Sequence, residues 1–273
     1  MLRLQTNDGW WLITHPEHAR LAGEFASHWG NDLFASPEPR GHVLRGVYAH
    51  DNGWAARDAH PLITSQGKPS AFSTELVGKY SAFEEIDLQA YLAVRREAVQ
   101  LIAQEDPYAA ILISMHTHNL LSARADRSTI RPEDLLWLDA FLVEQKTLQR
   151  ALRDRLLADK QVAVEHLLPD ALHKHFQLLQ ACDNLSLLSC TNFRGPTTLL
   201  HPFQITDGAL TEITVQPFGE RSFRLTPYPF DEPRLTFPLS ARHIPGHTFT
   251  TSDELEHLFH AAPVETIEVT ITA

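Results

Sequence analysis

The sequence has only two cysteines among its 273 residues, Cys182 and Cys190, and both fall in one expected helix. Eight helical residues separate them by a rise of about 12 Å, which is too far for a disulfide bond. We therefore expect two reduced thiols in the core. No apolar stretch approaches the roughly 18 residues of a membrane span. The N-terminus also lacks the basic start and apolar run of a secretory signal, so we expect a cytoplasmic protein without membrane contact.

Several common functional motifs are missing as well. The 12 glycines are scattered, and no glycine-rich loop precedes an expected helix as it does in phosphate-binding loops. There is no Gly-x-Ser-x-Gly elbow of a serine hydrolase. The net charge of −11 and the absence of a basic stripe argue against a nucleic-acid binder. A small-molecule substrate, with or without a phosphate group, is the expected partner, and the oligomeric state stays open.

The patterns that are present predict a mixed architecture. Strands 2–6 and 10–14 flank Asn7-Asp8-Gly9, a hairpin signal. Helical periodicity covers 16–30, 40–52, 87–105, 107–122, 133–159 and 162–190. After residue 190, proline-punctuated strands surround a helix at 252–260. We predict an α+β fold in a single domain, 1–273. Residues 15–190 form a helical core, and 1–14 with 200–273 form a β-rich appendage with a small antiparallel sheet.

The most informative pair of residues is His50-Asp51. Val43, Val47, His50 and Trp54 recur at helical spacing, so the pair lies on or beside an apolar helix face. The following Asn52-Gly53 predicts a left-handed stop for that helix. A buried carboxylate beside an imidazole needs a partner, and a divalent metal suits both groups.

Three other expected helices each carry a polar residue on an apolar face. His18 shares a face with Leu21 and Phe25, and Asp183 falls in line with apolar residues of the 162–190 helix. His116 lies one turn from Leu112, and His118 is its less favoured substitute. These positions predict that His18, His116 and Asp183 point inward with the His50-Asp51 pair.

The order His, His-Asp, His, Asp along successive helices resembles the HD superfamily of metal-dependent hydrolases, whose members are helical bundles. The resemblance implies one metal held by His18, His50, Asp51 and Asp183. Some branches of that superfamily, such as the HD-GYP phosphodiesterases and myo-inositol oxygenase, hold two metals with additional histidines, and His116 is placed to serve in that way. The Gly-Tyr-Pro tripeptide of the HD-GYP branch is absent.

A second resemblance covers nearly the whole chain. Five short runs look like a bacterial family known only as a domain of unknown function: 18–23, 50–54, 68–72, 114–116 and 183–187. This resemblance strengthens the site without naming a substrate.

Three imidazoles and two carboxylates suit Fe, Mn, Co, Ni or Zn, as one or two ions. We expect hydrolysis of a phosphate ester or nucleotide by a metal-activated water, with Asp51 as the catalytic carboxylate and as the bridging ligand if two metals bind. Two alternatives stay open. One is a di-iron oxygenase of the myo-inositol oxygenase type, and the other is a non-catalytic metal-binding or sensory module.

The segment 55–86 has no sustained period and begins directly after the His50-Asp51 pair. Long irregular segments in compact domains are often functional, which makes an active-site lid one interpretation and a surface excursion the other. Its candidate substrate contacts are Asp58, Lys68 and Lys79, and Trp54 precedes them.

Overall fold

The computed structural model describes residues 1–73 and 87–273. Its helices are α1 (His15–Ser27), α2 (Arg40–Ala49), α3 (Ala55–Asp58), α4 (Leu88–Glu105), α5 (Pro107–Asn119), α6 (Leu135–Asp159), α7 (Pro169–Cys190) and α8 (Ser252–Ala261). Its strands are β1 (Leu2–Gln5), β2 (Gly9–Ile13), β3 (Thr197–Thr198), β4 (Phe203–Gln204), β5 (Leu210–Thr211), β6 (Thr214–Gly219), β7 (Ser222–Thr226), β8 (Arg234–Pro245) and β9 (Glu265–Thr272). None of the described helices is long and apolar enough to cross a membrane.

The mixed α+β class is confirmed, but the sheet is larger than predicted. The described strands form a seven-stranded sheet in the order β1-β2-β8-β9-β7-β6-β3, and β4 pairs with β5 separately. The N-terminal hairpin completes this sheet, because β2 pairs with β8 from Gly9 opposite Pro245 to Leu12 opposite Arg242. One pairing, β7 with β9, is parallel, so the sheet is not antiparallel throughout. Strand alternation is clear along β8, where buried and exposed residues follow each other from Arg234 onward.

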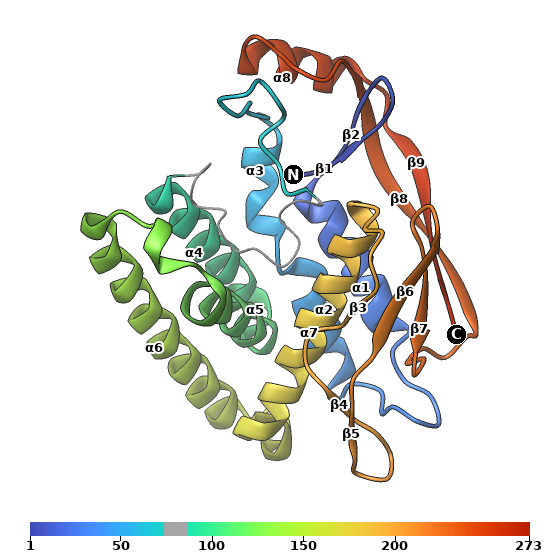
Figure 1. Ribbon diagram of the computed structural model, residues 1–273. Coiled ribbons are helices and arrows are strands. Elements are labelled where there is room, and N and C mark those ends of the chain that lie inside the picture. The colour runs from blue at the N-terminus through green and yellow to red at the C-terminus, as the bar shows by residue number, and fades with distance from the viewer. Residues whose placement is uncertain (74–86) are drawn as a thin grey trace.

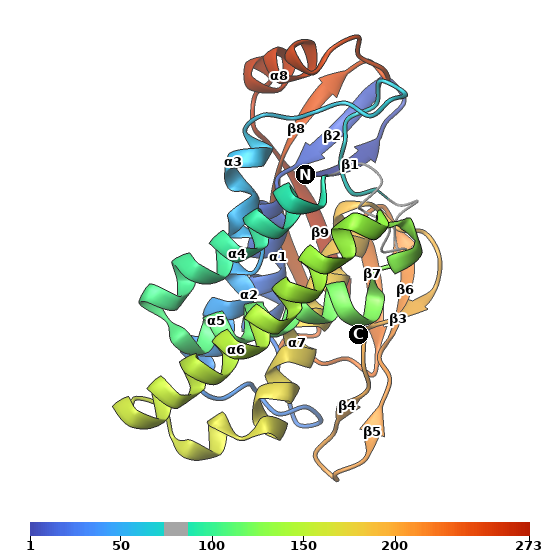
Figure 2. The same cartoon turned by 90° about the vertical axis from the view of Figure 1, so that its left-hand side faces the viewer.

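Helices α1, α2 and α4 to α7 lie on one side of the sheet, whereas α8 lies apart from them at one end of the sheet (Figures 1 and 2). Helix α1 packs against β8, α2 and α7, so it lies between the sheet and the rest of the bundle. Helix α5 contacts α2, α4, α6 and α7, which explains why nearly every one of its residues is buried. One continuous apolar cluster contains residues of α1, α5 and α7 together with residues of β6, β7, β8 and β9.

Two of the predicted helix ends were wrong. The helix predicted at 162–190 begins only at Pro169, after a short 3₁₀ turn at Val164–Leu167. Leu168 is extended with a ψ of 147°, because a following proline disfavours the helical conformation.

The two cysteines of α7, Cys182 and Cys190, are free and buried as expected.

The second wrong end is at the His50-Asp51 pair. Helix α2 ends at Ala49, and Asn52–Trp54 is a 3₁₀ turn in which neither Asn52 nor Gly53 has a positive φ. The glycine is needed for a different reason. A Cβ on Gly53 would lie 2.7 Å from the Ala98 Cβ and 2.7 Å from the Val94 carbonyl oxygen. Gly53 therefore allows close approach of α4 to the turn that follows Asp51.

Candidate metal centre

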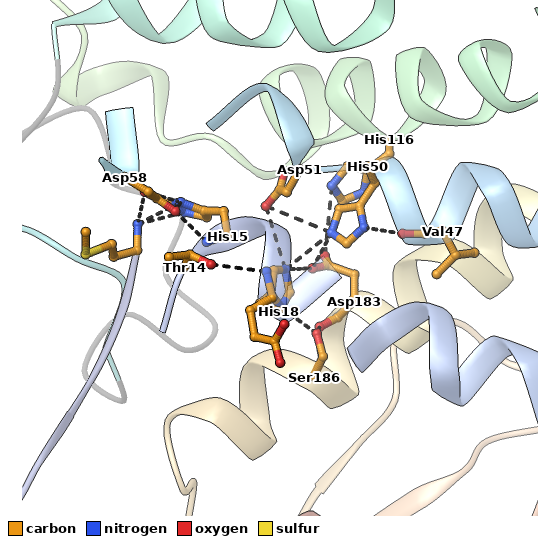
Figure 3. A network of polar contacts seen from close by, with 12 residues as sticks. Thr14, His15, His18, Val47, His50, Asp51, Asp58, His116, Asp183 and Ser186 are labelled. Carbon is orange, nitrogen blue, oxygen red and sulfur yellow. Dashed lines mark hydrogen bonds and ion pairs between the residues drawn. The ribbon is translucent and has the colours of Figure 1, made fainter. Parts of the chain in front are cut away.

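Five side chains from four parts of the fold meet in the interior, as Figure 3 shows. They are His18 from α1, His50 and Asp51 at the end of α2, His116 from α5 and Asp183 from α7. All five are buried, and the two carboxylates keep the most exposure, 5% for Asp51 and 7% for Asp183. Two trios of these residues have donor atoms within 4.8 Å of one another: His18, His50 and Asp51, and His50, His116 and Asp183.

Local sequence fixes the direction of the first two ligand candidates. Thr14 caps α1 by accepting a hydrogen bond from the Glu17 backbone N–H at 3.3 Å, which sets the start of the helix. His18 then points inward on the same face as Leu21 and Phe25. His50 is the C-cap residue of α2, so its side chain leaves the helix end beside that of His18.

The imidazole Nε2 atoms of His18 and His50 face each other at 3.2 Å. The Asp183 Oδ1 atom lies 3.1 Å from Nε2 of His18 and 3.3 Å from Nε2 of His50. The Asp51 Oδ2 atom lies 3.6 Å from Nε2 of His18 and 3.9 Å from Nε2 of His50. The Nε2 atoms of His18 and His50 thus each lie within 4 Å of an oxygen of both carboxylates.

The other ring nitrogens show how these imidazoles are oriented. His50 Nδ1 lies 2.7 Å from the Val47 carbonyl oxygen, which can only accept, so Nδ1 carries the proton. Ser186 donates its hydroxyl proton to the Asp183 carbonyl oxygen at 2.9 Å. A hydroxyl has one proton, so His18 Nδ1 donates to Ser186 Oγ across 2.5 Å. In the neutral rings, both Nε2 atoms therefore present lone pairs to the centre.

The two carboxylates use their oxygens differently. Asp51 Oδ1 accepts a hydrogen bond from the buried guanidinium of Arg95, which leaves Oδ2 for the histidines. Asp183 directs Oδ1 toward His18 and His50, whereas its Oδ2 lies 3.9 Å from Nε2 of His116. This geometry favours Asp183, instead of the Asp51 that we expected, as the carboxylate able to serve two positions.

The charges around the centre favour an added cation. Burial alone would raise the pKa of Asp51, but Arg95 and the surrounding imidazoles hold it well below its usual range. Burial likewise opposes ionisation of Asp183, but the neighbouring imidazoles of His18 and His50 lower its pKa. Burial would lower the pKa of His50, yet the carboxylates of Asp51 and Asp183 raise it. Two ionised carboxylates beside lone pairs thus attract positive charge into the position between them.

His116 is a neutral member of the cluster. Burial lowers the pKa of His116 to about 3, and its ring lies 5.4 Å from that of His50, centroid to centroid. Its Nδ1 atom is buried without a hydrogen-bond partner among the described residues. A buried polar nitrogen without a partner is costly. His116 therefore has one ring nitrogen, Nδ1, with unused hydrogen-bonding capacity, while its Nε2 is the atom that faces Asp183.

Three of the central atoms, the two Nε2 atoms and Asp183 Oδ1, fit a transition metal in type and in spacing. The Asp51 Oδ2 atom lies farther from the two Nε2 atoms, at 3.6 and 3.9 Å. Two ligands that each lie about 2.1 Å from an ion are separated by about 3.0–3.4 Å at tetrahedral or octahedral angles. Three of the separations are in that range, at 3.1, 3.2 and 3.3 Å. Ligating histidines usually donate the other ring N–H to an oxygen atom, as His18 and His50 do. The buried His/Asp clusters can therefore hold a metal ion.

Two of the predicted substrate contacts, Trp54 and Asp58, interact with residues outside the group of five. Trp54 is buried and stacks on His15 at a centroid distance of 4.7 Å. Asp58 is buried and accepts hydrogen bonds from the His15 backbone N–H at 2.5 Å and from the Met1 amino group at 2.8 Å. Asp58 therefore already has protein partners, whereas the Trp54 Nε1–H is buried without a hydrogen-bond partner among the described residues.

Of the two lysines that we predicted as substrate contacts, only Lys68 lies among the described residues. Lys68 is partly buried in a turn where its backbone pairs with Thr64. No hydrogen bond or ion pair joins it to the five central residues within 1–73 and 87–273. Lys79 and most of the second half of the proposed lid lie outside the described residues.

Sequence reasoning missed two residues that contact the centre directly. Arg95 lies on the buried face of α4 with Leu92 and Val99, so it is a charged residue on an apolar stripe, the same signal that pointed to Asp183. Ser186 follows Asp183 by one helical turn. Neither has a side chain typical of metal ligands, and a search for ligand types alone passes over both.

A comparison with protein families matches residues 1–246 to the model described as "Protein of unknown function (DUF3891)". The chain belongs to this family. No curated protein matches the chain, and no solved structure matches it.

Proposed function

We propose that the protein is a metal-dependent hydrolase of a phosphate ester or nucleotide, with the metal held by His18, His50, Asp51 and Asp183. The observation that carries the proposal is the convergence of four metal-ligating groups in a buried site: the Nε2 atoms of two imidazoles and the carboxylates of Asp51 and Asp183. A cation bound there would satisfy all four groups together. The HD-like ligand order belongs to the same proposal.

Each residue of the centre has a part in that activity. A divalent ion there supplies an acidified water and neutralises charge on a phosphoryl group. His18 and His50 are fixed by Ser186 and the Val47 carbonyl, and Arg95 fixes Asp51, so the ligand set is preorganised. The carboxylates are the most exposed members, and the substrate approaches from their side.

A second candidate function rests on His116. Its Nε2 atom and Asp183 Oδ2 offer two donors for a further ion, and an oxygen-activating di-iron centre would use both positions. The single Nε2 of His50 cannot serve two ions at once, so this further position has fewer protein ligands than the central one. A non-catalytic metal-binding module is the third possibility.

Turnover assays with metal analysis on one sample test the proposal. We expect the purified protein to contain a divalent transition metal and to hydrolyse a generic phosphodiester or a nucleotide when manganese is added. A protein that is coloured, contains about two irons and consumes oxygen would support the oxygenase instead. Bound metal without either activity across both assays would contradict catalysis and favour the binding module.

Replacement of His116 with alanine tests the number of ions. If His116 is a ligand of a second ion, the variant should bind about one metal per chain fewer than the parent, as measured by elemental analysis after gel filtration. His118→Ala is the matched control, since His118 lies on the same helix with its Nδ1 beside Ser122 Oγ at 3.3 Å. Equal metal content in both variants would place His116 outside the ligand set.

A further inference from the structure

A second feature of the molecule lies away from the metal centre, in a cleft of about 690 Å³ between α6 and α7. The C-terminal end of α6 runs beside the N-terminal end of α7 in both ribbon views (Figures 1 and 2). Residues of α5 form the floor of the cleft between these two helices. The cleft is large enough for a nucleotide-sized molecule.

One wall of the cleft carries three cations. Lys146, Arg150 and Arg153 line it from α6, at spacings of four and three residues, so they follow one helix face. Together they span about 10 Å along the axis. None of the three has an ion-pair partner among the residues described, whereas Arg155 on the same helix pairs with Asp159 at 3.6 Å.

The charge of this wall is opposite to that of the protein, whose net charge is −11. Arg153 donates its Nε proton to the Leu167 carbonyl at 2.7 Å, which fixes its stem against the cleft. One carboxylate, that of Asp170, also lines the cleft. The lining thus keeps a cationic excess, and a row of unpaired cations in a concave site attracts multivalent anions.

The floor of the cleft is apolar. Ile111, Met115 and Leu172 line it, and Ile111 and Leu172 are buried. Methionine side chains adapt to the shape of a ligand and make favourable contacts with aromatic rings. The cleft therefore combines a surface for an apolar or aromatic group with a cationic wall.

We propose that this cleft binds an organic polyphosphate of nucleotide type, with the phosphate chain along Lys146, Arg150 and Arg153 and the apolar part on Met115 and its neighbours. A row of three cations over about 10 Å suits a chain of two or three phosphoryl groups better than a single phosphate. The proposal does not depend on the metal-dependent activity, because no residue of the cleft is among the five of the metal centre.

Met115 precedes His116 on α5, and the cleft residue Gln149 donates a hydrogen bond to Ser114 Oγ at 3.0 Å. A ligand in the cleft therefore contacts the helix that carries His116. This arrangement makes the cleft a second, separate site on α5, and not an extension of the metal centre.

The test uses the full chain as purified, with no added metal, and titrates it with ATP, tripolyphosphate and adenosine by isothermal calorimetry. We expect ATP to bind more tightly than either part alone, since it can use the wall and the floor together. Replacing Arg150 with glutamate should weaken ATP and tripolyphosphate binding by about tenfold or more, in line with loss and reversal of a charge-assisted contact.

Arg155→Glu is the matched control, because it makes the same change of charge on the same helix outside the cleft. It should leave the ATP affinity unchanged. Equal weakening by both variants would show a long-range charge effect and overturn the site. So would unchanged ATP binding in Arg150→Glu, equal binding of adenosine and ATP, or no ATP binding at millimolar concentration. A circular dichroism spectrum of each variant confirms that the helices are retained.

Discussion

Replacement of Asp51 with alanine is expected to abolish metal binding at the centre and also to lower the free energy of unfolding by about 3–5 kcal/mol. The second effect follows from Arg95, whose side chain is only 8% exposed and pairs with Asp51. Removal of the carboxylate leaves a buried guanidinium without its counter-ion. Among the described residues, Arg95 then keeps the hydrogen bond to the Tyr91 hydroxyl at 3.1 Å and its contacts with the Trp54 and Tyr91 rings. Chemical denaturation and elemental analysis measure the two losses.

A double variant separates these two roles of Asp51. In Asp51→Ala/Arg95→Met both charges are gone, and methionine can pack on Trp54 and Tyr91, so most of the stability should return. Metal binding should not return, because the ligand is still missing. Recovery of metal by the double variant would remove Asp51 from the ligand set.

The surface pair Arg96–Glu144 supplies the stability control. Its side chains are 38% and 41% exposed, so Glu144→Ala should change the free energy of unfolding by no more than about 1 kcal/mol. A loss in Asp51→Ala as small as that in Glu144→Ala would contradict the buried ion pair as a source of stability.

The convergence of the five side chains of the candidate metal centre could be predicted in part because each of them breaks a local pattern. His18 and Asp183 are polar residues at helical spacing among apolar ones, and the structure buries both beside His50. Periodicity shows which way a side chain points on its own helix. It does not show which helices become neighbours, and the family resemblance supplied that part of the prediction.

Features that depend on distant contacts could not be predicted in this way. Asn52-Gly53 has the composition of a left-handed stop, yet Gly53 is required by α4, whose residue Ala98 lies against it. The pairing of Asp51 with Arg95 depends on the same approach of two segments 44 residues apart. A local pattern contains no information about such an approach.

The size of the sheet has a similar explanation. Individual strands such as β8 show alternation in the sequence, but strand order depends on pairings between distant residues. Trp10 of β2, for example, lies opposite Ile244 of β8. The parallel pairing of β7 with β9 spans the α8 segment, and the short strands predicted there do not specify it.

Removal of bound metal is expected to lower the melting temperature of the protein by about 5–10 °C. A ligand at about 100 times its dissociation constant stabilises the folded state by about 2.7 kcal/mol, and each kcal/mol corresponds to about 2–4 °C in a chain of this size. The physical source is the group of acceptor atoms around Nε2 of His18 and Nε2 of His50, which repel one another and the carboxylates once the ion is lost. Differential scanning calorimetry before and after chelation and dialysis measures the shift, and added manganese should reverse it.

His18→Asn is the control, since a variant that lacks the ligand should show no shift on chelation. A shift of equal size in that variant would mean that the stabilising metal binds elsewhere, and a purified protein that contains no metal and gains no stability from manganese would contradict the proposed centre.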